Sequence, residues 1–147
     1  MEVTVRKAEK EDASQLSDLF VEFTGAPSDI TAMRETIELI SKRPEYYVAV
    51  ACEQERVVGT AMGIICRDLC GDGRPFMLIE NVVVAQSYHG EGIGKRLMNE
   101  LEQFGRENRC KYVILVSEAD RTDSHHFYES LGYPSGEEVG FKKKLDE

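Results

Sequence analysis

A glycine-rich segment past the middle of the chain has the residue types and spacing to bind an anion. Gly90, Gly92 and Gly94 alternate with larger residues, and Lys95 follows them. Glycine lacks a Cβ, so backbone N–H groups in such a loop can come close to a ligand. The segment follows the β-branched run 82–84 and precedes a helical pattern, and a helix start has unpaired N–H groups and a positive dipole end. Strand, glycine loop and helix start therefore predict a cradle for a diphosphate.

Two familiar phosphate loops fit this segment poorly. A Walker loop ends in Gly-Lys followed by Ser or Thr, whereas Lys95 is followed by Arg96. A dinucleotide-binding loop follows the first strand of a βαβ unit, whereas this loop lies past mid-chain. The cradle therefore belongs to a different arrangement of strands and helices.

Composition limits the classes of protein to which the chain can belong. Its 147 residues suit a single domain spanning 1–147. A net charge of −9 disfavours a nucleic-acid partner, which a basic face would bind. The four cysteines lack metal-site or secreted-framework spacing, and no apolar run is long enough for a membrane span or a secretion signal. We expect a cytoplasmic protein with no membrane partner.

The hydrophobic periodicity predicts alternating strands and helices in one α/β domain. Strands are predicted at 2–7, 46–52, 56–66, 76–84, 112–116 and 139–145. Helices are predicted after the acidic start 9–12, after Ser28 with Ser28 as cap, over 93–104, and around 125–131 with Asp120 or Thr122 as cap. The short polar stretch 53–55 predicts a hairpin, and hence antiparallel pairing.

Three motifs, in this order, resemble the GNAT superfamily of acetyl-CoA-dependent N-acetyltransferases. They are Ile-Glu-Asn-Val-Val-Val at 79–84, His-Gly-Glu-Gly-Ile-Gly at 89–94 and Phe-Tyr-Glu-Ser-Leu-Gly-Tyr at 127–133. The resemblance implies the GNAT fold: a single mixed, mostly antiparallel central sheet with a splayed parallel strand pair and flanking helices. His89 departs from the family pattern, which has arginine or glutamine there.

The resemblance also implies a binding site for acetyl-CoA as the acetyl donor. The strand segment before the loop would pair with the pantetheine arm, and the loop would hold the pyrophosphate. Arg121 matches a position that often contacts the cofactor in relatives, although a surface role is equally open. The predicted cofactor-binding residues are Val82, Val83, Val84, His89, Gly90, Glu91, Gly92, Ile93, Gly94, Lys95 and Arg121.

Acetyl transfer to an amine needs three further contributions from the protein. An alkyl amine is mostly protonated at neutral pH, and Glu80 is the candidate base. Strand alternation would put Glu80 on the face of Val82 and Val84; alternatively, it only holds a neighbouring loop. A strand N–H near Val82 or Val83 would stabilise the oxyanion. Tyr128 matches the family's general acid, with a core tyrosine as the alternative.

The acceptor is predicted less sharply than the donor. Segment 80–132 is similar to glucosamine-6-phosphate N-acetyltransferases and 121–133 to aminoalkylphosphonate N-acetyltransferases, which implies a small amine as substrate. Arg34, Arg67 and Arg74 could hold an anionic group, while a polyamine or an aminoglycoside stays open. The alternatives are a protein or peptide N-acetyltransferase and a non-catalytic CoA-binding regulatory module.

No metal is expected, because the adjacent residues His125 and His126 would point about 100° apart on a helix. The predicted final strand, 139–145, could pair across a two-fold axis. We therefore expect a metal-free protein that forms a homodimer.

Overall fold

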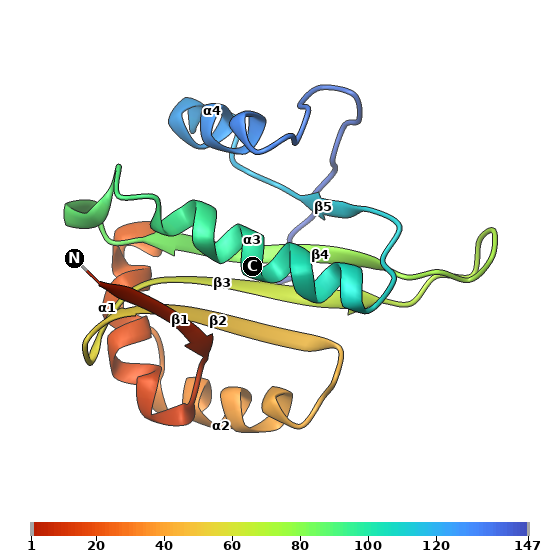
Figure 1. Cartoon of the computed structure of the whole chain (residues 1–147). Helices are drawn as coiled ribbons and strands as arrows, with labels where there is room; N and C mark the ends of the chain where they lie inside the picture. The colour runs from red at the N-terminus through yellow and green to blue at the C-terminus, as the bar shows by residue number, and fades with distance from the viewer. Residues whose placement is uncertain (1, 147) are drawn as a thin grey trace. The chain divides into compact units, whose positions relative to one another are not determined.

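The computed structural model describes residues 2–146, and the chain forms two compact units, residues 1–114 and 115–147. The elements, labelled in Figure 1, are β1 (Val3–Lys7), the short 3₁₀ helix η1 (Lys10–Asp12), α1 (Ala13–Thr24), α2 (Ile30–Ser41), β2 (Tyr46–Glu53), β3 (Arg56–Cys66), β4 (Phe76–Val84), the 3₁₀ helix η2 (Gln86–Tyr88), α3 (Ile93–Glu107), β5 (Val113–Leu115) and α4 (Thr122–Ser130).

The strands form one sheet in the order β1-β2-β3-β4-β5. The pairs β1–β2, β2–β3 and β3–β4 are antiparallel, and β5 is parallel to β4. Ahead of β5, the Met77 N–H donates to the Tyr112 carbonyl at 3.0 Å. The predicted mixed, mostly antiparallel sheet is confirmed, although β5 is shorter than the predicted strand 112–116.

Helix α3 packs on one face of the sheet through an apolar stripe (Figure 1). The buried side chains of this stripe are Ile93, Leu97, Met98 and Leu101. A Cβ at Gly59 of β3 would come within 3.1 Å of Leu97 and 3.2 Å of Ile93, so glycine lets the helix approach closely. This contact fixes the N-terminus of α3, where the glycine loop joins it.

Helices α1 and α2 cover part of the opposite face. Their apolar residues share a buried cluster with the central strands, whose members are Ala13, Leu16, Leu19, Ile37, Val50, Cys52, Val57 and Val83. Asp12, which precedes α1, is 5% exposed and makes two 2.8 Å hydrogen bonds with Arg6 of β1. Burial raises the pKa of Asp12, but the bonds from Arg6 and the Glu9 N–H outweigh it, so that pKa lies below its ordinary value.

Several predicted boundaries and one predicted strand are wrong. Asp29, not Ser28, caps α2, because its Oδ1 accepts from the Ala32 N–H at 2.9 Å. Arg121, rather than Asp120 or Thr122, occupies the N-cap position of α4, and it makes no capping bond through its side chain.

The predicted final strand, 139–145, is irregular within the residues that the structure describes. Val139, Phe141 and Leu145 are 75%, 95% and 94% exposed. Alternating apolar residues favour a strand only where a neighbouring strand accepts its N–H and C=O groups. In residues 2–146, no helix is long and apolar enough to span a membrane.

Candidate functional site

The loop between η2 and α3 has a backbone conformation that glycine adopts readily. Gly90 and Gly92 have φ angles of 84° and 79°, in the left-handed region. A Cβ at either position would meet no atom within 4 Å, so the outer side of the loop is open. The first helical bond runs from the Arg96 N–H to the Gly92 carbonyl at 3.1 Å, which leaves the N–H groups of 93–95 without helical acceptors. The predicted anion cradle therefore has suitable geometry.

The side chains of the loop divide into buried and exposed groups. Ile93 is 2% exposed and belongs to the core, so it offers only its backbone to a ligand. Glu91 and Lys95 are exposed. Lys95 is therefore the loop side chain available to neutralise a bound phosphate, and Glu91 carries the wrong charge for that role.

Two carboxylates fasten the turn that precedes the loop. The Gln86 N–H donates to Glu22 of α1 at 3.1 Å, and the Tyr88 hydroxyl donates to Glu53 of β2 at 2.6 Å. The bond to Glu53 raises the pKa of Tyr88, and the Arg56 guanidinium lies 5.7 Å from the Tyr88 ring centroid. Elements far apart in sequence thus hold the entry to the glycine loop. The sequence reasoning missed Tyr88 and Glu53, since nothing in their spacing shows that they meet.

His89 ties the start of the loop to the end of β4. Its Nε2 lies 2.8 Å from the Val84 carbonyl oxygen. A carbonyl only accepts, so Nε2 carries the proton and donates it. This bond directs the ring of His89 toward the strand.

Strand β4 contains a bulge in the segment predicted to bind the pantetheine arm. On β3, Thr60 and Met62 are separated by one residue, but their partners on β4, Val83 and Glu80, are separated by two. Asn81, one of the two residues that lie opposite Ala61, has a φ of 59°, which asparagine tolerates better than most residues. A bulge places its extra residue outside the regular ladder, and this bulge lies next to Val82.

The bulge corrects the predicted orientation of Glu80. Because Thr60 and Met62 share a face of β3, their partners Val83 and Glu80 share that face of β4. Val83 packs with the α1 and α2 cluster, and Val84 pairs with Gly59 on the α3 face. Glu80 is therefore on the face of Val83 and not on that of Val82 and Val84. Its side chain is exposed there.

Tyr128 lies on α4 in the second unit, among other aromatic residues. Its ring centroid is 5.1 Å from that of Phe127 and 6.3 Å from that of Tyr133. Its carbonyl also accepts from the Tyr133 N–H at 3.1 Å, which closes the end of the helix. Tyr128 is only partly buried.

Two further polar residues of the second unit contact Glu118. Arg121 Nε lies 3.8 Å from Glu118, and His125 Nε2 lies 2.8 Å from the Glu118 carbonyl. Over residues 2–146, no group of three or more His, Cys, Asp or Glu side chains is arranged to hold a metal ion.

The three arginines considered for an anionic substrate differ in their contacts. Arg74 donates to the carbonyls of residues 109 and 110, at 3.0 and 3.5 Å, and so fastens the β3–β4 loop to the turn after α3. Arg34 donates to the Lys10 carbonyl at 3.4 Å. Arg67 is exposed at the end of β3. The role of Arg74 is thus explained by its contacts within the fold.

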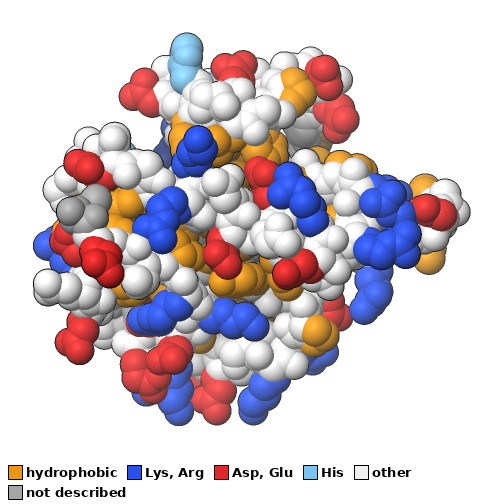
Figure 2. Space-filling view, viewed as in Figure 1, with side chains coloured by type: hydrophobic (Ala, Val, Ile, Leu, Met, Phe, Trp, Pro, Cys, Tyr) orange, Lys and Arg blue, Asp and Glu red, His pale blue; other side chains and the backbone are white. Residues whose placement is uncertain are grey.

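Charged side chains of both signs intermingle on the face shown in Figure 2, with apolar side chains visible between them. This mixture covers one face of a chain whose net charge is −9. It resembles an ordinary solvated surface more than the continuous basic face of a nucleic-acid-binding protein.

Comparisons with known proteins agree with the motifs. The profile of the Acetyltransferase (GNAT) family matches residues 13–133. The glucosamine 6-phosphate N-acetyltransferase of Trypanosoma brucei brucei is 33% identical over 139 residues, 93% of this chain and 92% of that protein. A crystal structure of a Trypanosoma brucei acetyltransferase superposes with a TM-score of 0.85 at 32% identity, over 98% of this chain and 100% of the other. An aminoglycoside N-acetyltransferase in complex with CoA superposes with a TM-score of 0.83 at 20% identity, over 99% and 96%.

Proposed function

Because the chain belongs to the GNAT acetyltransferase family, and is therefore an acyltransferase, we propose that it moves an acetyl group from acetyl-CoA to the primary amine of a small molecule. The observation that carries the donor assignment is the left-handed, outward-open pair Gly90 and Gly92 directly before α3. A loop of this geometry offers N–H groups to a pyrophosphate. When bound, acetyl-CoA supplies a thioester carbonyl that an amine can attack.

The residues around the loop fit that ligand. The N–H groups of 93–95 and the Lys95 ammonium would hold the pyrophosphate. Tyr88 and His89, bonded to Glu53 and to the Val84 carbonyl, would hold the loop in shape before the ligand arrives. A cradle that is already ordered loses less conformational entropy on binding.

The transfer step assigns distinct tasks to the bulged strand and to α4. Glu80, exposed on β4, would take the proton from the ammonium form of the acceptor, directly or through water. A backbone N–H at the bulge near Val82 would donate to the developing oxyanion. Tyr128 would donate a proton to the leaving thiolate, and Arg121 would contact the donor or a phosphate of the acceptor.

For the acceptor we propose a small amine, and the first compound to test is glucosamine 6-phosphate. The support is the similarity, over most of both chains, to a protein of that name. An aminoglycoside is the second compound, because the chain also resembles aminoglycoside N-acetyltransferases in fold.

The test is a screen of amines with acetyl-CoA in which release of free thiol is followed. Acetylation of glucosamine 6-phosphate or of another small amine supports the proposal. Transfer to peptides alone would favour a protein or peptide N-acetyltransferase. Acetyl-CoA binding without transfer to any acceptor would favour a non-catalytic CoA-binding regulatory module. Failure to bind acetyl-CoA would overturn both the loop assignment and the enzyme reaction.

We further propose that residues 1–147 work as a single cytoplasmic domain and assemble as a homodimer. The exposed apolar residues Val139 and Phe141 support assembly, since apolar side chains of a soluble chain gain stability when a partner covers them. Sedimentation at several protein concentrations measures the oligomeric state, and a monomer at all of them would contradict the dimer.

A further inference from the structure

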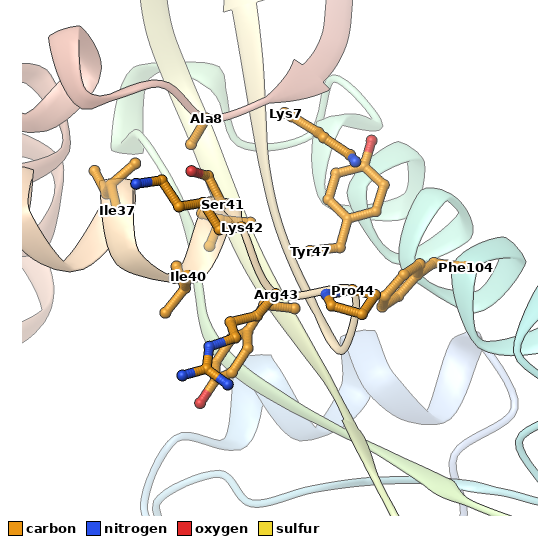
Figure 3. A pocket seen from close by; sticks show the side chains of 12 residues that line it. Lys7, Ala8, Ile37, Ile40, Ser41, Lys42, Arg43, Pro44, Tyr47 and Phe104 are labelled. Atoms are coloured by element: carbon orange, nitrogen blue, oxygen red, sulfur yellow. The ribbon is translucent and has the colours of Figure 1, made fainter.

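A pocket of about 290 Å³ lies at the edge of the sheet where β1 ends and β2 begins (Figure 3). Lys7, the last residue of β1, pairs with Ala49, so the first residues of β2 extend past β1. The end of α2 contributes Ile37 and Ile40 to the lining, and Lys7 and Tyr47 line the side formed by β1 and β2 (Figure 3). The pocket therefore forms where the first residues of β2 have no β1 residue beside them.

Part of the pocket wall is apolar. Ile40, Tyr47, Val48 and Phe104 line it and are only half-buried, so they retain surface that a ligand could cover. The rings of Tyr47 and Phe104 pack edge to face, with centroids 5.4 Å apart, which gives that wall a fixed shape. Such walls favour a ligand with an apolar body.

The charges at the pocket have one sign. Its twelve lining residues include three cations, Lys7, Lys42 and Arg43, and no carboxylate. None of these cations belongs to an ion pair found in the described part of the chain. Burial, with Glu100 and Glu107 of α3, raises the pKa of Tyr47, but neither glutamate lines the pocket. In a chain with a net charge of −9, this is a local concentration of positive charge.

We propose that this pocket binds a small organic carboxylate with an aromatic or branched aliphatic body. The apolar part would cover Ile40, Val48 and Phe104, and the carboxylate would meet Lys42 and Arg43 at the mouth. The volume equals that of about ten water molecules, so the ligand has roughly ten non-hydrogen atoms.

The pocket is separate from the proposed transfer site. Val48 pairs with Met62, and Met62 pairs with Glu80, so two strand spacings, about 10 Å, separate the pocket from the candidate base. The glycine loop does not line it. Ligand binding in this pocket therefore requires neither acetyl-CoA binding at the glycine loop nor acetyl transfer.

The test uses three probes of one shape and different charge: phenylacetate, phenylacetamide and phenethylamine. Each is titrated into the 15N-labelled protein, and backbone shifts are followed. We expect saturable shifts at the lining residues with phenylacetate, with a dissociation constant on the order of 1 mM, and weaker or no binding by the other two. Arg43→Glu should weaken phenylacetate binding roughly tenfold. Lys143→Glu, which makes the same charge change outside the pocket, should not.

A second variant keeps the test independent of charge. Ser41 is exposed and lines the pocket, so Ser41→Trp should fill it and remove phenylacetate binding while the rest of the spectrum is retained. Gly92→Val, in the glycine loop, should leave phenylacetate binding unchanged. Equal binding of the three probes, shifts away from the lining residues, or unchanged affinity in both Arg43→Glu and Ser41→Trp would overturn the proposal.

Discussion

Replacement of Gly92 by valine should cost far more acetyl-CoA affinity than removal of the His89 side chain. Gly92 has a φ of 79°, which costs an L-residue roughly 1–2 kcal/mol and is still less favourable for a β-branched one. The valine variant would escape that strain by moving the backbone, which displaces the N–H groups of 93–95. Two lost charge-assisted bonds, each about 1.5–3 kcal/mol, would weaken binding by roughly a hundredfold or more.

His89→Ala removes one bond, between Nε2 and the Val84 carbonyl at 2.8 Å. A neutral hydrogen bond contributes about 0.5–1.5 kcal/mol, so affinity should fall by at most about tenfold. The loop loses one attachment, but Tyr88 and Gln86 still hold its entry.

Isothermal titration calorimetry with acetyl-CoA measures both variants, and Gly71→Val is the matched control. Gly71 also has a left-handed φ, 65°, and open space where a Cβ would stand, but it lies in the β3–β4 loop. Its replacement introduces similar strain without touching the cradle, so affinity should stay within about twofold of wild type. A larger loss from His89→Ala than from Gly92→Val, or an equal loss from Gly71→Val, would refute the reasoning.

Three further predictions address the other residues. Tyr128→Phe should lower kcat by roughly a hundredfold or more in a thiol-release assay, and Glu80→Gln should lower kcat by a similar factor; unchanged kinetics would reject the acid or the base in turn. Tyr88→Phe should raise KM for acetyl-CoA several-fold with kcat retained, because the bond to Glu53 shapes the loop but takes no part in transfer; an effect on kcat alone would exclude this role. Asp12→Asn should destabilise the protein by about 2 kcal/mol at pH 7, a value discounted because Arg6 is 42% exposed. Since the pKa of Asp12 lies below its ordinary value, its contribution is present at neutral pH and is lost as pH falls below about 4, so urea titrations of wild type and variant should converge in acid.

Most of the fold could be predicted from the sequence, because hydrophobic periodicity reports which side of an element is buried. Helix α3 shows this well: Ile93, Leu97 and Leu101 recur at helical spacing, and all three are buried. The prediction of a final strand at 139–145 is wrong, because hydrophobic periodicity does not report whether a neighbouring strand is present. Val139 and Phe141 have the residue types of a strand, but they are exposed.

In the candidate site, too, local features could be predicted from the sequence and features that depend on other strands could not. The glycine loop could be located because Gly90 and Gly92 have a local conformational role, and both adopt left-handed backbone. The orientation of Glu80 could not, because the extra residue at Asn81 breaks the alternation on which the prediction depended. The role of Tyr88 could not be predicted either, because its hydrogen-bond partner, Glu53, lies on a strand that is distant in sequence.

Because of the bulge at Asn81, odd-numbered residues of β4 face different helices before and after it. Before it, Met77 and Ile79 are fully buried, with Met77 near Leu101 and Gly105 of the α3 layer; after it, Val83 packs in the cluster of α1 and α2. Deletion of Asn81 would leave Glu80 and Val83 two positions apart, so plain alternation would keep both residues on their present face. One added residue would instead have to enlarge the bulge, or it would exchange the two faces of β4 up to the loop. We expect β4 to keep its fold when Asn81 is deleted and to be disrupted when a single codon is inserted after Asn81.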